Sequence, residues 1–256
     1  PNSGCGSWLL ENQSTNLYLN SETLVTQSNA TSASTYTVSF YGSGSITFSG
    51  THIGSLVGNG ADERVSVTFT ATSGTLTSTI IGSVNKGQLE EQTHSTSYIP
   101  TSGATNTRNQ DISTNSGNAT LINSTEGVLY AEIAALADSV NGRYISIGDG
   151  SLSNYVYIRI TGILNEIKMG VIKGGSTQAS KSFTVPNLKQ SNKLAVSYQQ
   201  DLFRFYVNGT LIFTDTNGDI FPIGTLNALT FNLANTNNYF NGKNKCLAVY
   251  KEALTS

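Results

Sequence analysis

The chain has 256 residues and a formal net charge of −2, and its 12% of charged residues is about half the usual share in soluble domains. Its 38% hydrophobic and 9% aromatic content excludes a disordered chain, and it contains no run of about 18 apolar residues that could span a membrane as a helix. The low net charge also argues against nucleic-acid binding through a basic face.

The length allows one large β domain or two of moderate size. Cys5 and Cys246 lie near opposite ends, so they cannot form a disulfide framework and can pair only if the two ends meet. Free thiols are the favoured expectation. The sequence begins at Pro1 without a signal peptide, which is typical of a piece of a longer protein.

Short segments of alternating residues dominate the first half of the chain. One face of each segment is apolar and the other carries hydroxyl groups, at 36–40, 46–48 and 65–69. Turn residues separate them at Gly42–Gly44 and at Ser73–Gly74. Strands at intervals of about ten residues predict a β-sandwich or jelly roll.

The stretch from Thr23 to Ala61 contains no Asp, Glu, Lys or Arg. A β-prone stretch of this kind is an aggregation hazard when its strand edges are open. Two interpretations stay open. Either a second module or neighbouring copies of the chain cover it, or its Gly, Ser and Thr turns keep the strands short enough to be harmless.

Residues 100–120 interrupt this pattern, because Pro100–Gly103 ends a strand and a polar stretch follows. We expect this segment to link two modules, 1–106 and 107–256, and we expect a cut near Ser113 to release a C-terminal module that folds alone. Strands are predicted beyond it at 128–136, 143–147, 155–160, 166–172, 182–185, 193–198, 202–207, 211–215, 228–233 and 245–250.

The second half contains one clear turn signal and one segment with an ambiguous pattern. Asn208-Gly209 lies between two predicted strands and is the strongest short hairpin signal. Val128–Val140 fits a helix with Leu129 and Ile133 on one face, and it also fits an alternating strand. Its Ala content slightly favours the helix, whereas the resemblance described next favours the strand.

The predicted hairpin of the second half resembles a known fold. The segments Lys193–Tyr198 and Leu202–Ile212 are similar to the core hairpin of laminin-G-like, concanavalin-type jelly rolls, in which a strand ending in Tyr precedes Tyr-Val-Asn-Gly. Phe240–Lys243 and Leu247–Thr255 resemble the closing strand and tail of that family. The resemblance covers about residues 125 to 256. It implies an all-β chain with two sandwich or jelly-roll modules in tandem, the second of them concanavalin-like.

The first half carries a second resemblance. Leu9–Leu17 is similar to the opening of tail-fibre and other virion proteins of tailed bacteriophages, although Asn12 stands where Pro is common. Gln88–Glu91, Thr96–Thr101 and Thr107-Arg108 match another phage segment. The resemblance implies that the first module is similar to carbohydrate-binding modules of phage proteins.

Together, the two resemblances imply a bacteriophage virion protein, such as a tail fibre, that binds a host-surface polysaccharide or protein without catalysis. The alternative is a purely structural head-fibre, decoration or fibre-cap component with no small-molecule ligand. The implied partners are other virion subunits, with a homotrimer favoured, and neither nucleic acid nor membrane insertion is expected. The implied location is the phage particle surface, or the extracellular space if a bacterium encodes the protein.

We expect no catalytic site. His52 and His94 have no Cys or Asp partner at a recognised metal-ligand spacing. Glycosidases need two carboxylates that flank the bond, and the Glu-x-Asp-x-x-Glu strand motif of jelly-roll glycosidases does not occur. The adjacent pairs Asp62-Glu63 and Glu90-Glu91 would point to opposite faces of a strand. No enzyme activity, metal or cofactor is therefore predicted.

Calcium ions are held by carboxylate and amide oxygens, and some laminin-G-like and lectin modules contain such a site. Candidates here are Asp149, between Gly148 and Gly150, and Asp215 with Asp219, around Asn217-Gly218. Ordinary turn chemistry accounts for the same pattern and is the favoured interpretation.

Sugar sites combine aromatic faces with polar side chains in loops on a rigid sheet. Two segments of the second half fit this description, one after the Gly-Asp-Gly turn at 148–150 and one within 235–239. The predicted ligand-binding residues are Asp149, Asn154, Tyr155, Asn237, Asn238 and Tyr239. For Tyr155 the alternative is a strand residue that packs inward. Trp8, beside two leucines, is expected to pack into a core.

Overall fold

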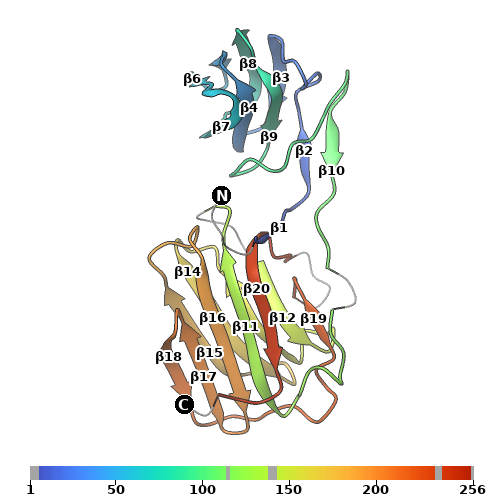
Figure 1. The fold of residues 1–256 in the computed structure, drawn as a ribbon, viewed down its shortest axis with the longest axis vertical. Coiled ribbons are helices and arrows are strands. Elements are labelled where there is room, and N and C mark those ends of the chain that lie inside the picture. The colour runs from blue at the N-terminus through green and yellow to red at the C-terminus, as the bar shows by residue number, and fades with distance from the viewer. Residues whose placement is uncertain (1–5, 114–115, 138–142, 234–237, 255–256) are drawn as a thin grey trace. The chain divides into compact units, whose positions relative to one another are not determined.

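The computed structural model describes residues 6–113, 116–137, 143–233 and 238–254, and every regular element within them is a β-strand (Figure 1). The all-β prediction is confirmed, and residues 128–134 of the segment that also fitted a helix are a strand. No helix in the described part of the chain is long and apolar enough to cross a membrane. The chain divides into a first unit, Asn12–Gln110, and a second unit that combines Pro1–Glu11 with Asp111–Ser256.

The first unit consists of two antiparallel sheets and a short ribbon, with strand orders β3-β8-β5-β6, β7-β4-β9 and β10-β2. Its core contains the apolar positions of the alternating segments, including Tyr36, Val38, Phe40, Ile46 and Phe48. The strands are β2 (Ser14–Asn16), β3 (Gln27–Thr31), β4 (Thr35–Gly42), β5 (Ser45–Gly50), β6 (Gly54–Val57), β7 (Gly60–Thr70), β8 (Gly74–Ile81), β9 (Asn85–Glu90) and β10 (Asn106–Arg108).

The hydroxyl face of β4 is buried, contrary to the simplest expectation from its alternation. Thr37 Oγ1 donates to the carbonyl of Gln92 at 2.9 Å, and Arg64 donates to Ser39 Oγ at 2.7 Å and to the carbonyl of Thr96 at 2.5 Å. The segment after β9 therefore covers this face, and the buried hydroxyls have hydrogen-bond partners, as buried polar groups require.

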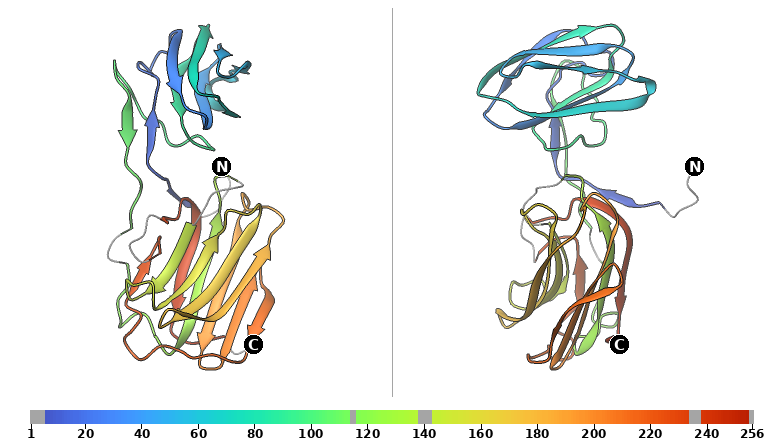
Figure 2. Two further views of the ribbon diagram at one scale, coloured as in Figure 1. Left: turned by 180° about the vertical axis from the view of Figure 1, so that it is seen from behind. Right: turned by 90° about the vertical axis from the view of Figure 1, so that its left-hand side faces the viewer.

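The second unit is a sandwich of two antiparallel sheets, ordered β1-β20-β11-β16-β17-β18 and β15-β14-β13-β12-β19. Figure 2 shows these sheets as two layers. The strands are β1 (Trp8–Leu10), β11 (Glu126–Ala134), β12 (Arg143–Gly148), β13 (Tyr155–Ile160), β14 (Glu166–Lys173), β15 (Ser176–Thr184), β16 (Asn192–Gln199), β17 (Leu202–Val207), β18 (Thr210–Asp215), β19 (Ala228–Thr230) and β20 (Gly242–Tyr250).

The core of the second unit lies between its two sheets. Alternate residues of each strand point inward, such as Leu129 on β11, Ile147 on β12 and Phe205 on β17, and all three are fully buried. The other alternate residues form the outer faces of the sandwich. These two outer faces are the surfaces that the strands leave available to a ligand.

The division into units differs from the expected boundary between residues 106 and 107. The opening segment groups with the C-terminal part of the chain, because β1 pairs antiparallel with β20, with Trp8 opposite Asn244 and Leu10 opposite Gly242. Sequence separation concealed this pairing, since more than 200 residues lie between the two strands.

The predicted hairpin at Asn208-Gly209 is confirmed, since β17 and β18 pair on either side of it and both residues have positive φ, 50° and 83°. These angles are those of a type I′ turn, which matches the twist of the two strands. Replacing Gly209 with Val should cost about 1–2 kcal/mol of stability, because a β-branched residue is strained in this region. Urea denaturation would measure the loss, and an unchanged midpoint would contradict the expectation.

Candidate functional site

The outer face of the five-stranded sheet carries a group of tyrosines. Tyr144 lies on β12, and Tyr155 and Tyr157 lie two residues apart on β13, so all three point away from the sandwich core. The ring centroids of Tyr144 and Tyr157 are 5.6 Å apart, as are those of Tyr155 and Tyr157. Such tilted contacts are favourable aromatic geometry.

A glycine lets Tyr157 lie close to the sheet. A Cβ at Gly170 on β14, opposite Tyr157 in the strand register, would come within 2.8 Å of the Tyr157 ring and hydroxyl. On the other side of the group, the guanidinium carbon of Arg159 lies 5.1 Å from the centroid of the Tyr144 ring, within the range of a cation–π contact. Tyr157 therefore lies close against Gly170, and Tyr144 is in contact with Arg159.

The phenols of Tyr155 and Tyr157 remain proton donors at neutral pH. Burial raises the pKa of Tyr155 and of Tyr157 above the usual value, and in Tyr157 a hydrogen bond with Ser180 lowers it by a smaller amount. Tyr157 is only 6% exposed, whereas Tyr155 is half-buried at the edge of the group. Tyr155 is therefore the tyrosine of β13 that a ligand can reach.

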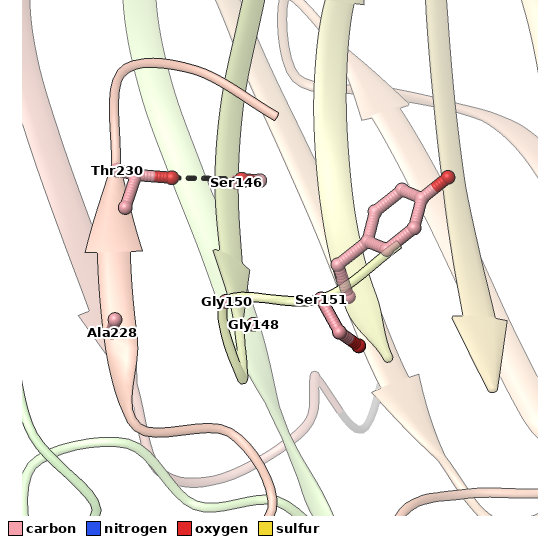
Figure 3. Close-up of a pocket in the computed structure, with 7 residues that line it drawn as sticks. Ser146, Gly148, Gly150, Ser151, Ala228 and Thr230 are labelled. Atoms are coloured by element: carbon pink, nitrogen blue, oxygen red, sulfur yellow. Dashed lines mark hydrogen bonds between the residues drawn. The ribbon is translucent and has the colours of Figure 1, made fainter. Parts of the chain in front are cut away.

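A small hollow lies beside Tyr155. Its empty volume is about 280 Å³, and its lining residues come from β12, β13, β19 and the turn after β12: Ser146, Gly148, Gly150, Ser151, Tyr155, Ala228 and Thr230. Figure 3 shows Ser146 and Thr230 facing each other across neighbouring strands, with their hydroxyl oxygens 3.0 Å apart. Ser146 also donates to the carbonyl of Asn232 at 2.7 Å.

The size and chemistry of the hollow limit what it can hold. Much of that space is open to solvent: only about 20 Å³ of it can be occupied by a water-sized molecule, far below the range of about 300–1,000 Å³ for small-molecule pockets. The floor consists of small residues, with Gly148 paired opposite Ala228, and one wall is an aromatic side chain. The hollow thus offers hydroxyl groups, accessible backbone and an aromatic surface to one small polar group.

The turn that forms the rim contains two of the predicted site residues. Asp149 accepts hydrogen bonds from the backbone N–H of Ser151 and from the Asn154 amide, each at 2.8 Å. The Asn154 oxygen accepts from the N–H of Gly174 at 2.9 Å. Burial raises the pKa of Asp149, but these hydrogen bonds lower it more, so the carboxylate is ionised. Asp149 and Asn154 hold the rim in shape.

The second predicted group does not lie beside the first. Asn237 is outside the described residues. Tyr239 forms a bridge with Tyr144 at the start of β12, and the Asn238 carbonyl accepts from the N–H of Tyr144 at 3.4 Å. Gly148, where the hollow lies, is about 13 Å farther along β12 at 3.3 Å per residue. The structure therefore brings Asp149, Asn154 and Tyr155 together and leaves Asn238 and Tyr239 elsewhere.

Sequence reasoning missed Ser146, Gly148, Ala228 and Thr230, which form the floor. The available signal was the alternation of the 143–148 segment, which places Ser146 and Gly148 on the face opposite Ile145 and Ile147. The partner strand β19 is too short to give a comparable pattern.

The phage-like segments of the first unit form a buried polar network. The Asn16 amide donates to the carbonyls of Gly87 and Ile99, at 3.0 and 2.9 Å, and its oxygen accepts from the N–H groups of Tyr18 and Leu89, both at 3.1 Å. Gln88 Oε1 accepts from the N–H of Ile99 at 2.7 Å. One side chain thus connects segments that are more than 70 residues apart.

Glu90 belongs to the same network. It is fully buried and accepts hydrogen bonds from the Ser14 hydroxyl at 2.6 Å, from the Thr96 N–H at 3.1 Å, and from the Thr96 hydroxyl. Glu91 is exposed on the opposite side of the chain. A carboxylate fully occupied by three internal donors stabilises the fold, so this pair does not form a catalytic site.

The remaining candidates have local structural roles. Asp215 accepts from the N–H of Asn217 at 3.1 Å, as in an ordinary turn, and Asp219 forms an ion pair with Lys173 at 3.1 Å. The His52 ring stacks on Phe69, with centroids 3.9 Å apart. No group of three His, Cys, Asp or Glu side chains arranged to hold a metal occurs among the residues that the structure describes.

Two predictions for the ends of the chain have different outcomes. Cys246 is exposed, and the expectation of free thiols stays a prediction because Cys5 lies outside the described residues. Trp8 is 72% exposed, so the prediction that it packs into a core is wrong. The reason is its place on β1, which is the edge strand of the six-stranded sheet.

Comparison with known proteins gives a family and a fold. A sequence profile described as the concanavalin A-like lectin/glucanases superfamily, of the laminin G type, matches residues 106–256. No curated protein matches the chain.

Three solved structures illustrate the similarity in fold. The sialidase module CBM40 of Ruminococcus gnavus, bound to α2,6-sialyllactose, is 16% identical over 51% of this chain and 79% of that chain, with a TM-score of 0.41. The heptameric SAP-like pentraxin of Limulus polyphemus is 15% identical over 53% and 68%, with a TM-score of 0.40. Domains LG4-5 of the mouse laminin α1 chain are 9% identical over 100% and 94%, with a TM-score of 0.38.

Proposed function

The chain belongs to the concanavalin A-like lectin/glucanases superfamily through residues 106–256, and from this premise we propose that its second unit binds a carbohydrate without cleaving it. The binding site is the hollow beside Tyr155. The observation that carries the proposal is the combination of one accessible aromatic ring with a floor of hydroxyl groups and small residues.

Each part of the hollow matches one part of a sugar. The Tyr155 ring offers a flat surface to sugar C–H groups, and the oxygen of the half-buried Thr230 hydroxyl, which donates to the Asn232 carbonyl, can accept a hydrogen bond from a sugar hydroxyl. Gly148 and Ala228 leave room for the sugar to approach the backbone. Because the hollow encloses only about 20 Å³, the sugar would lie against Tyr155 with one substituent in the hollow.

The chemistry of the lining supports binding without hydrolysis. The lining residues are Ser, Gly, Tyr, Ala and Thr, so the lining contains neither of the two carboxyl groups that most glycosidases use. The nearby Asp149 carboxylate is engaged by Ser151 and Asn154. A bound glycan would therefore be held but not attacked.

We further propose that the chain is part of a bacteriophage virion and that the glycan belongs to the host surface. The resemblance of Leu9–Leu17, Gln88–Glu91 and Thr96–Thr101 to phage virion proteins supports this, and a trimer on the particle surface is the proposed assembly. The buried network of Asn16 and Glu90 favours a second candidate, a purely structural virion role, because it accounts for these segments without any ligand.

A glycan array tests the proposal. The full chain should bind at least one bacterial surface glycan, and Tyr155→Ala should reduce that binding about tenfold or more, since tyrosines in binding pockets often contribute at least 1.4 kcal/mol. Tyr250→Ala is the matched control, because Tyr250 is 56% exposed on the other sheet. Equal binding by the Tyr155→Ala variant, or no binding by the unaltered chain, would contradict the proposal.

A further inference from the structure

The outer face of the six-stranded sheet contains a second hollow with a different chemistry. Its empty volume is about 390 Å³, and it is lined by Ser7, Glu132, Ile133, Ala134, Lys189, Ser191, Lys243 and Lys245. This hollow lies on the opposite sheet from the Tyr155 site. Its lining contains no aromatic residue and three lysines.

A β-bulge in β20 adds Lys245 to the outer face of this sheet. The register between β11 and β20 shifts after Glu132, so that Glu132 lies opposite Cys246 and Ile133 lies opposite Asn244. Lys245 is the extra residue of the bulge, and both it and Lys243 are exposed. Bulges commonly redirect a side chain next to a functional site, and here the bulge adds a cation to the outer face.

A carboxylate fixes the arrangement. Glu132 is 8% exposed, and its Oε1 atom accepts from Ser191 Oγ at 2.7 Å and lies 3.1 Å from Lys245 Nζ. The Ser191 hydroxyl and the Lys245 ammonium hold the pKa of Glu132 below its usual value, although burial acts in the opposite direction. Lys193 lies directly opposite Glu132 on β16. Four lysines, at 189, 193, 243 and 245, therefore line this hollow or lie beside it.

The exposed tryptophan lies at the edge of this basic cluster. Trp8 pairs with Asn244, which lies opposite the core residue Ile133, so the Trp8 side chain leaves β1 on the side away from Lys243 and meets the cluster at Lys245. A neighbouring hollow is lined by Gly6, Trp8, Asn244, Lys245, Cys246 and Leu247, so Lys245 borders both hollows. Trp8 is the only Trp of the chain and is 72% exposed. Large exposed aromatic side chains next to polar groups commonly mark binding surfaces.

We propose that the four lysines bind the anionic groups of an acidic polysaccharide, and that the polysaccharide passes over the sheet edge at Lys245, where the Trp8 ring contacts a sugar face. The net charge of the whole chain is −2, so the positive charge of these four lysines is confined to this part of the surface. A nucleic-acid groove would combine a continuous basic track with several stacking side chains, whereas this surface has one tryptophan and no Arg. The proposal does not depend on the Tyr155 site.

Binding of polygalacturonate, dextran sulfate and neutral dextran by the full chain tests the proposal. The two acidic polymers should bind with an affinity that falls as salt increases, and neutral dextran should not bind. The double variant Lys193→Glu/Lys243→Glu should lose about tenfold or more in affinity, while it leaves the Lys245–Glu132 pair intact. Trp8→Ala should weaken both acidic polymers without changing the thermal midpoint, because its side chain is exposed.

The control is Lys181→Glu/Lys251→Glu, which makes the same change in net charge at two exposed positions outside both hollows. An equal loss in this control would overturn the proposal in favour of general charge attraction. Tighter binding of a single-stranded DNA 20-mer through the same lysines would also overturn it. Tyr155→Ala should leave binding of the acidic polymers unchanged, so the two sites can fail independently.

Discussion

Replacing Asn16 with alanine is expected to lower the free energy of unfolding of the first unit by about 3–5 kcal/mol, because four buried hydrogen bonds are lost at once. The Asn16 amide satisfies the carbonyls of Gly87 and Ile99 and the N–H groups of Tyr18 and Leu89. Asn16 is fully buried, so water cannot easily replace these partners. A loss of this size is a large fraction of the 5–15 kcal/mol that stabilises a typical domain.

Hydrogen exchange of the full chain, which reports on each unit separately, would measure this effect. Protection should fall across β4, β7 and β9 of the first unit and stay unchanged in the second unit. Asn106→Ala is the matched control, since Asn106 is exposed and its side chain makes one hydrogen bond, to the Pro100 carbonyl. Equal effects of the two substitutions would show that the buried network contributes little.

This expectation gives the phage-like segments a physical meaning. Their polar residues are those that the network uses: Ser14, Asn16, Gln88, Glu90 and Thr96. Buried polar groups specify one arrangement of the chain, because any other arrangement leaves them without partners. The polar residues that carry the resemblance therefore stabilise the fold of the first unit.

Replacing Ala228 with phenylalanine is expected to abolish carbohydrate binding at the Tyr155 hollow, with a loss of about a hundredfold or more. Ala228 lies opposite Gly148 on the edge strand β19, and both line the hollow. A phenyl ring at this position would lie over the glycine and fill the small volume, as aromatic residues do across from glycine in sheets. The strand is short and half-exposed, so stability should change little.

The matched control for this experiment is Thr184→Phe. Thr184 is exposed on β15, the other edge of the same sheet, so the two variants add a similar ring to equivalent strands. Isothermal titration with the glycan that the array ranks first would compare them. Retained affinity in Ala228→Phe would place the ligand elsewhere, and an equal loss in Thr184→Phe would indicate a general effect on the sheet.

Much of the fold was predictable because its determinants are local. Alternation at 36–40, 155–160 and 202–207 placed strands correctly, since one side of each sheet faces a core. The Asn208-Gly209 turn was predictable because few dipeptides adopt two successive positive φ angles. The choice of strand over helix for β11 needed the resemblance, because its alanines suit either structure.

The site was less predictable because its parts are distant in the sequence. Tyr155 could be found from an aromatic residue after a Gly-Asp-Gly turn, but Ser146 and Thr230 meet only because β12 pairs with β19. Asp149 and Asn154 were chosen for their polar groups, and those groups are used within the turn. Local chemistry identified the loop, whereas tertiary pairing determined which face a ligand can reach.

The exposed position of Trp8 has the same cause. A Trp beside two leucines suggests a core residue, but β1 occurs at the edge of a sheet, where one side of the strand has no neighbour. Strand order, which the sequence does not reveal, decides whether an apolar residue is buried or accessible.

The most direct test of the central claim is a titration of the ¹⁵N-labelled chain with the glycan that the array ranks first, followed by two-dimensional NMR. We expect the largest shifts at the backbone amides of Gly148, Gly150, Ser151 and Tyr155, around the hollow. Shifts confined to the first unit, or to Lys243–Cys246 on the opposite sheet, would contradict the claim that this hollow is the carbohydrate site.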